Sequence, residues 1–166
     1  MNYQLIILEI AVVVLGLGIL LADLWTPLEA KRKLGYLAAI ILGLILIGSF
    51  KFSTPDPQYA FGGMYVLDDL ALFFKRFFLV ATIIVLVMSV EFAARIEAGI
   101  SEYYALILFA LAGMMFAASA NDFSLLFVSV ELITVTFYIL TSFQRGRLVS
   151  LEAGVKYLIL GALSSA

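Results

Sequence analysis

The sequence predicts an all-α polytopic membrane protein, with five complete transmembrane helices and the start of a sixth. Its 166 residues are 64% hydrophobic and only 13% charged, which is more apolar surface than a soluble domain of this size buries. Apolar stretches long enough to cross a hydrocarbon core of about 30 Å recur along almost the whole chain. The first stretch contains Glu9 and has no basic segment before it, so we interpret it as a retained helix and not a cleaved signal peptide.

The complete helices are predicted from five apolar runs. These runs cover residues 5–22, 34–50, 71–92, 103–120 and 123–143. Residues 51–70 contain prolines, glycines and acids, which is typical of an irregular external loop. A sixth helix begins near Ser150, and the uncharged residues 157–166 cover about 15 Å of it, so we expect this helix to be incomplete. We expect residues 1–166 to form a single membrane domain.

The basic residues predict the orientation of the chain, because Lys and Arg near helix ends favour the cytoplasmic side. They gather in the loops after the first, third and fifth predicted helices, which lie on one side of the membrane. The opposite side has Lys51, with Lys75 and Arg76 at the membrane boundary. The amino terminus is therefore predicted to face outside. The residues assigned to the cytoplasmic side are Lys31, Arg32, Lys33, Arg95, Arg145 and Arg147.

The composition also excludes several kinds of site. The chain has no Cys and no His, which removes disulfides, thiolate chemistry, haem ligation and the usual zinc sites. Its formal net charge of -2 is too small to indicate nucleic-acid binding. We therefore expect no cofactor and no metal in this chain, no nucleic-acid partner, and the lipid bilayer as its surroundings.

Glu131 is the strongest candidate for a functional residue, since it is the ionisable group in the otherwise uncharged run 123–143. An ionised carboxylate at the bilayer centre costs about 2.5 kcal/mol or more, so such residues usually face protein or water and serve a function. Helical spacing places Ser124, Thr134 and Tyr138 on the same face. Burial favours the neutral acid and a nearby cation favours the carboxylate, so movement of a cation could change the protonation of Glu131.

A structural role is the alternative interpretation of Glu131. The acid could stay protonated and hydrogen-bond a neighbouring helix, while Ser124 and Thr134 bond their own backbone. We favour proton exchange over this alternative.

Lys156 is the second candidate, about 9 Å inside the cytoplasmic boundary of the sixth helix. Glu152 precedes it by one helical turn, in the favourable order for a local ion pair. The sequence leaves open whether Lys156 takes part in a proton relay or only in this pair. Glu131 and Lys156 differ by about 9 Å in depth, so water or another side chain would have to bridge them.

The remaining charged and aromatic residues are interpreted as anchors at the membrane surface. Glu9 is expected close enough to the outer boundary to reach water. Lys75 and Arg76 are expected to extend toward that boundary. An interfacial charge cluster is expected from Asp68, Asp69, Lys75 and Arg76, and aromatic belts from Trp25, Tyr65, Tyr103 and Tyr104.

Three segments resemble a known family. Residues 150–166, with Lys156 followed by Tyr157 and then a Gly-Ala-x-Ser-Ser pattern, are similar to the sixth helix of subunit N of the proton-pumping NADH-quinone oxidoreductase, respiratory complex I. Residues 121–132 and 138–140 resemble the fifth helix of that subunit. Residues 68–74 resemble the entry to its third helix. In specific motifs, the resemblance covers roughly the second half of the chain.

The resemblance implies the amino-terminal portion of an antiporter-like subunit with fourteen helices and two inverted five-helix repeats. It also implies a proton relay that contains the glutamate of the fifth helix, here Glu131, and the lysine of the sixth helix, here Lys156. In the family this glutamate works with a lysine on the seventh helix, which this sequence does not reach.

The same resemblance implies the partners and the location of the chain. The partners are other membrane-arm subunits of complex I and the missing carboxy-terminal helices, in the same chain or another. NAD, FMN, iron–sulfur clusters and quinone are expected in other subunits, and the location is the inner membrane of a bacterial cell.

Proton translocation coupled to NADH-quinone electron transfer is therefore the function that we expect, with the chain as a subunit of a proton-translocating oxidoreductase. The same fold also serves multisubunit cation/proton antiporters and membrane-bound hydrogenases. A structural membrane protein without catalytic role is the alternative from another class.

Overall fold

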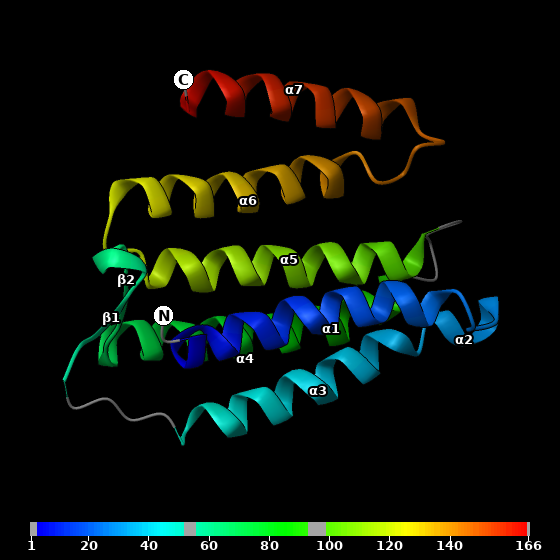
Figure 1. Cartoon of the computed structure of the whole chain (residues 1–166). Coiled ribbons are helices and arrows are strands. Elements are labelled where there is room, and N and C mark those ends of the chain that lie inside the picture. Colours follow the sequence, from blue (N-terminus) through cyan, green and yellow to red (C-terminus); the bar gives the residue numbers. More distant parts are fainter. Residues whose placement is uncertain (1–2, 52–55, 93–98, 166) are drawn as a thin grey trace.

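The computed structural model describes residues 3–51, 56–92 and 99–165 of the chain. Successive long helices run in alternating directions and form a layered bundle (Figure 1). The polytopic all-helical class predicted from composition is confirmed. The long helices are α1 (Ile7–Asp23), α3 (Leu34–Ser49), α4 (Asp69–Phe92), α5 (Ile100–Ala118), α6 (Phe123–Thr141) and α7 (Leu148–Ser165).

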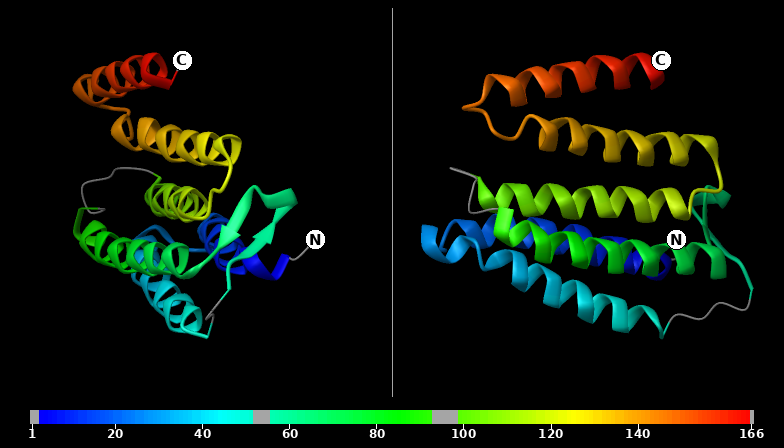
Figure 2. Two further views of the ribbon diagram at one scale, coloured as in Figure 1. Left: turned by 90° about the vertical axis from the view of Figure 1, so that its left-hand side faces the viewer. Right: turned by 180° about the vertical axis from the view of Figure 1, so that it is seen from behind.

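The helix α5 lies at the centre of the packing and contacts α1, α4 and α6. On one side of it, α3 packs against α4, and on the other side α7 packs against α6. Figure 2 shows the same order from two further directions, with α6 and α7 standing apart from the group formed by α1, α3 and α4. The helices that carry the predicted site therefore lie at one edge of the bundle.

The expected count of five complete spans is not confirmed. Within the described ranges, four helical segments are long and apolar enough to cross a bilayer: Gln4–Asp23, Asp69–Phe92, Ile100–Ala118 and Phe123–Thr141. The helix α3 is apolar but has only 16 residues, which correspond to about 24 Å. The helix α7 has 18 residues, or about 27 Å, and begins two residues before the expected Ser150.

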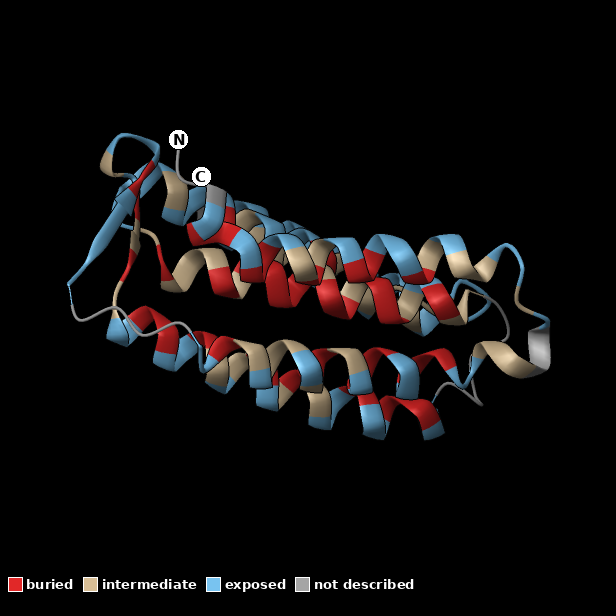
Figure 3. Cartoon of the chain, turned by 60° about the horizontal axis from the view of Figure 1, so that its bottom comes forward, coloured by how far each residue is buried: buried red, intermediate tan, exposed pale blue. Residues whose placement is uncertain are grey.

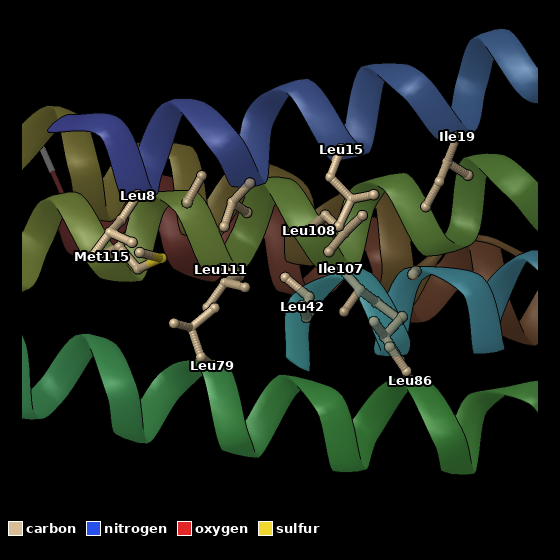
Figure 4. Packing of buried hydrophobic residues seen from close by; sticks show 14 of the residues in the cluster. Leu8, Leu15, Ile19, Leu42, Leu79, Leu86, Ile107, Leu108, Leu111 and Met115 are labelled. Carbon is tan, nitrogen blue, oxygen red and sulfur yellow. The ribbon is translucent and has the colours of Figure 1, made fainter. Parts of the chain in front are cut away.

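The core of the bundle consists of leucine, isoleucine and valine side chains between α1, α3, α4 and α5. Figure 4 shows Leu79 of α4 directed at Leu111 of α5, and both are fully buried. Buried residues line the helix sides that face each other, and exposed residues occupy the outer sides (Figure 3). Val12 has no exposed surface, for example, whereas Val14 on the outer side of α1 is 59% exposed. Outward apolar faces are expected where the solvent is lipid.

Polar contacts matter more in such a bundle than in a soluble core. Lipid tails are as apolar as leucine, so the hydrophobic effect does not drive helices together within the bilayer, and close packing and hydrogen bonds do. The described residues place such polar contacts at both ends of α1.

A small β-hairpin covers one end of the bundle, where an irregular loop was expected. Strand β1 (Gln58–Ala60) pairs antiparallel with β2 (Tyr65–Leu67), and the 3₁₀ turn η2 (Phe61–Gly63) joins them. Gly62 and Gly63 have φ angles of 67° and 93°, which glycine adopts without strain. The Val66 N–H donates to the carbonyl of Ser119 over 2.9 Å, so the hairpin is fastened to the end of α5.

The opposite end of the bundle collects the basic loops. The alternating helix directions bring the end of α1, the short helix α2 (Leu28–Lys31) and the α6–α7 connection to this end (Figure 1). Lys31 pairs with Asp23 at 2.8 Å, and the Arg32 Nε donates to the Val90 carbonyl at 2.8 Å. Arg95, which was assigned to the same side, lies outside the described residues. Which side of the membrane this end faces remains a prediction.

Candidate functional site

Glu131 lies in the middle of α6, a helix that is mostly exposed at the edge of the bundle. Only Ser129 and Thr136 of its described residues are buried, and Glu131 itself is half-buried. The Thr134 hydroxyl donates to the Glu131 carbonyl oxygen at 3.0 Å and lies 3.5 Å from its carboxylate Oε2. The carboxylate therefore keeps a polar neighbour one turn away, and most of its surroundings in α6 are apolar side chains.

The other members of the expected polar face are arranged differently. Ser124 is exposed at the start of α6, where its backbone N–H donates to the Asp122 carboxylate over 2.8 Å. Tyr138 is directed at α7, with its ring edge-on to Tyr157 at a centroid distance of 5.0 Å. Thr134 is the one member of the predicted face for which a contact with Glu131 is described.

Lys156 is exposed on α7 and forms a local ion pair. Its Nζ lies 2.6 Å from Glu152 Oε1, and the two side chains are 70% and 63% exposed. The described residues contain no ion pair between Lys156 and Glu131. The pair with Glu152 exists, and a role of Lys156 in proton transfer remains a prediction.

Small residues allow α6 to approach its two neighbours. A Cβ atom on Gly113 of α5 would lie 2.8 Å from a side-chain carbon of Ile133, so a larger residue there would force Ile133 or the helices to shift. Gly161 of α7 faces the ring of Tyr138 in the same way, and a Cβ there would lie 2.7 Å from the ring carbon Cζ. Close packing at Gly113 and Gly161 thus fixes α6 between α5 and α7.

A second charged site, which was not predicted as a site, lies at the hairpin end of the bundle. Lys75 Nζ of α4 lies 2.7 Å from Glu9 Oε1 of α1, and both side chains have 0% exposure. The Tyr65 hydroxyl of β2 accepts a hydrogen bond from Lys75 Nζ over 2.7 Å. It also lies 3.0 Å from Glu9 Oε1 and 2.9 Å from the Leu5 carbonyl, and can donate to either oxygen. We call Glu9, Tyr65 and Lys75 the buried triad.

The buried triad joins three elements that are distant in the sequence. Burial raises the pKa of the Tyr65 hydroxyl well above its usual range, and the negative charge of Glu9 adds to this increase. The hydroxyl therefore stays protonated and acts as a donor. The Lys75 ammonium also lies 4.9 Å from the centroid of the Tyr65 ring, which is within the range of a cation–π contact.

Several expectations about this end of the bundle were wrong. Glu9 does not reach water, and Lys75 does not extend to the membrane surface, because each neutralises the other inside the bundle. Tyr65 is buried and hydrogen-bonded to both residues, and it is not an interfacial anchor. At the opposite end of the bundle, Tyr104 is also buried, and its hydroxyl lies 3.3 Å from the Arg32 carbonyl. Of the expected charge cluster, Asp68 accepts a hydrogen bond from the Ala71 N–H over 2.7 Å at the start of α4, and its negative charge also acts on Lys75.

Arg76, a further member of the expected cluster, contacts the end of α3. One of its guanidinium nitrogens donates to the Ser49 carbonyl over 3.0 Å, and its guanidinium carbon lies 4.6 Å from the centroid of the Phe50 ring. Arg76 thus holds the end of α3 to α4.

The sequence contains a signal for the Glu9–Lys75 pair. Glu9 is an isolated charge in the first apolar run, Lys75 is followed by Arg76 in the third, and both lie a few residues from the start of a helix. The first and third predicted helices run in the same direction, so these charges lie at similar depth from the same end. Opposite charges at matched depth in parallel spans indicate a pair.

Metal binding has no support in the described part of the chain. No group of three or more Asp, Glu, His or Cys residues is arranged there to hold an ion. Carboxyl, amine and hydroxyl groups, which can exchange protons, are present in the sites described above.

The fold and these sites define a multi-pass α-helical membrane protein with ionisable groups inside its helices. Residues 120–166, which include Glu131 and Lys156, match the family model described as NADH:quinone oxidoreductase/Mrp antiporter, TM. Among known proteins the chain is similar to NADH-quinone oxidoreductase subunit N of Heliobacterium modesticaldum, with 38% identity over 168 residues that cover 100% of this chain and 35% of the relative. The same subunit of Moorella thermoacetica is 38% identical over 165 residues, which cover 99% of this chain and 34% of the relative.

A solved structure supports the same relationship. A chain of respiratory complex I from Thermus thermophilus with bound aureothin matches with a TM-score of 0.71 and 25% identity, over 95% of this chain and 34% of that chain. The resemblance to subunit N expected from the sequence is therefore confirmed, and it extends along the whole chain and not only its second half. The chain spans about a third of the length of these relatives.

Proposed function

We propose that this chain is the amino-terminal portion of an antiporter-like membrane subunit with fourteen helices, which translocates protons while NADH reduces quinone elsewhere in the assembly. The observation that carries the proposal is the similarity to subunit N along the whole chain, with Glu131 and Lys156 inside the segment that matches the antiporter family model. Residues 1–166 would form a single membrane domain within that subunit.

Glu131 binds and releases the proton in this proposal. Glu131 lies in the middle of α6, and burying a carboxylate at such a depth in a membrane is costly unless a cation lies close by. When electron transfer elsewhere moves such a cation toward Glu131 or away from it, the acid releases or binds a proton. Thr134, one turn away, offers a hydroxyl to the carboxylate. The cation would come from the part of the subunit that this chain does not include.

Lys156 is the second member of the relay. Its pair with Glu152 is exposed on α7, so only a small free energy, about 0.3–0.5 kcal/mol, opposes separation of the two charges. Lys156 can therefore exchange Glu152 for another partner at little cost. Water or a further side chain would connect Lys156 to Glu131.

The assembly around the chain follows from the same proposal. Other membrane-arm subunits would cover the exposed apolar faces of α6 and α7 together with lipid. NAD, FMN, iron–sulfur clusters and quinone would be held by other subunits, and this chain would contain no redox centre. The assembly would lie in the inner membrane of a bacterial cell, with the amino terminus of this chain outside and the basic end of the bundle in the cytoplasm.

A second candidate function is supported by the family description, which includes cation/proton antiporters as well as the oxidoreductase. A subunit of a multisubunit antiporter would use the same acids but would exchange protons for a cation and need no NADH. A membrane-bound hydrogenase subunit would need hydrogen chemistry in its partners in place of NADH.

The proposed function is tested with the complete assembly that contains this chain, purified and reconstituted into sealed vesicles. Addition of NADH and a short-chain quinone should produce a pH gradient that a protonophore collapses. A pH gradient that forms only when sodium is added on one side, without NADH, would support the antiporter instead. Quinone reduction by NADH without any ion gradient would contradict both functions.

A further inference from the structure

The buried triad is a costly arrangement if its role is only structural. A carboxylate and an ammonium group that are both excluded from solvent lose their hydration, and apolar residues of similar volume often stabilise a protein as well or better. Glu9 and Lys75 have no exposed side-chain surface. Ionisable groups within membrane helices usually mark a path for ions or protons.

One oxygen of the triad is free to bind a proton. Glu9 Oε1 lies within hydrogen-bond distance of Lys75 Nζ and of the Tyr65 hydroxyl. Glu9 Oε2 is buried and has no hydrogen-bond partner among the described residues. A proton can therefore bind at Oε2 without breaking a hydrogen bond that is already present.

The Tyr65 hydroxyl gives the triad two arrangements that need no movement of heavier atoms. The hydroxyl has a single proton but lies close to two acceptors, Glu9 Oε1 at 3.0 Å and the Leu5 carbonyl at 2.9 Å. While Glu9 is a carboxylate, the hydroxyl donates to it. Once Glu9 is protonated, rotation about the C–O bond directs the same proton to Leu5, and Lys75 continues to donate to the Tyr65 oxygen.

The charges around the triad permit both states. Asp68 contributes a second negative charge that acts on Lys75, and this charge favours the ammonium form when Glu9 is neutral. The Ser119 hydroxyl at the end of α5 lies beside Tyr65 and carries no charge. These groups come from every element packed against the triad: α1, the start of α4, β2 and α5.

The triad lies near the hairpin end of the bundle. Glu9 is the third residue of α1 and Lys75 the seventh of α4, which places them within about 10 Å of the helix starts. Exposed hairpin and loop residues, including Tyr59 and Asn121, lie at this end.

We propose that Glu9, Tyr65 and Lys75 form a second proton-exchange site, which binds one proton on Glu9 from the end of the bundle that the hairpin covers. The step transfers one proton from a hydronium ion to Glu9 Oε2: an O–H bond of hydronium breaks, an O–H bond to Glu9 forms, and water is released. Release is the reverse step. This inference rests on the proposed function, in that it adds a site to a chain that translocates protons.

Infrared difference spectroscopy on the complete assembly tests the site directly, through the C=O stretching band of a protonated carboxyl group as pH is lowered. We expect a band that Glu9→Gln abolishes, that Tyr65→Phe shifts through loss of a hydrogen-bond partner, and that Glu91→Gln, at an exposed carboxyl of α4, leaves unchanged. A spectrum that is identical in wild type and Glu9→Gln would overturn the proposal.

If Glu9→Gln fails to assemble, the Tyr65→Phe spectrum decides: a shifted band supports the site, and an unshifted spectrum rejects it. The band does not depend on NADH or on pumping. A titrating Glu9 in an assembly that pumps no protons would therefore contradict the proposed function alone, and a pumping assembly with no Glu9 band would contradict only this site.

Discussion

Lys75 Nζ of α4 lies 2.7 Å from Glu9 Oε1 of α1, and neither side chain has exposed surface. Removal of one partner leaves the other as an uncompensated buried charge, whereas removal of both leaves none. The stability of the fold should therefore be more sensitive to loss of one partner than to loss of both.

The single variant Lys75→Met should lower the free energy of unfolding by about 3–5 kcal/mol, because the Glu9 carboxylate is then buried alone. The double variant Glu9→Leu with Lys75→Met should recover most of this loss. Thermal unfolding in detergent, followed by circular dichroism, measures both. Equal stability of the single variant and wild type would show that Glu9 is not held as a buried carboxylate.

Gly161 should be intolerant of a side chain, because its added Cβ meets the Tyr138 ring, 2.7 Å from Cζ. The ring is held against Tyr157, so Gly161→Ala should cost about 1–3 kcal/mol as an overpacked contact. Gly43→Ala on α3 is the matched control, since a Cβ there has no atom within 4 Å. Thermal unfolding compares the two, and equal effects would contradict the packing of α7 on α6.

Asp122 caps α6 by accepting a hydrogen bond from the Ser124 N–H over 2.8 Å. Asp122→Ala should destabilise the protein by about 1 kcal/mol, and Asp122→Asn, which keeps an acceptor oxygen, should restore most of that loss. Denaturant titration in detergent measures the difference. If the alanine variant is as stable as wild type, the cap does not contribute to stability.

Lys156→Ala should reduce the rate of NADH oxidation coupled to proton pumping, with the stability of the protein nearly unchanged. The pair with Glu152 is exposed and worth only about 0.3–0.5 kcal/mol. Glu152→Gln breaks the same pair but keeps the lysine, so it serves as the control and should retain activity. An equal loss in both variants would assign Lys156 to the local pair and not to a relay.

The helices were largely predictable, because long apolar runs between loops with charges and turn residues leave few alternatives in a membrane. The boundaries moved by a few residues, as at α5, which begins at Ile100 and not at 103. The hairpin β1–β2 was not predicted. Its strands have three residues each, which is too short for an alternating pattern to be recognised. Contacts with the end of α5, which lies far away in the sequence, hold the hairpin in place.

The buried triad was missed for a different reason. Glu9 and Lys75 each lie close to the end of a helix, where a single charge usually reaches water, so each alone favoured an interfacial position. They become enclosed only because α1 and α4, the helices that carry them, both pack against α5. The position of Glu131 within a long helix was predictable from the sequence. Its charge partner was not, because no lysine or arginine of the described residues pairs with it.

The proposed role of Glu131 is tested most directly by the number of protons pumped per NADH oxidised, in vesicles that contain the complete assembly. Glu131→Gln removes the ionisable group and keeps a similar shape, and Glu91→Gln makes the same change at an exposed position of α4. We expect pumping to be lost or strongly reduced in Glu131→Gln and unchanged in Glu91→Gln. A proton-to-NADH ratio and a pumping rate in Glu131→Gln equal to those of wild type would contradict the account.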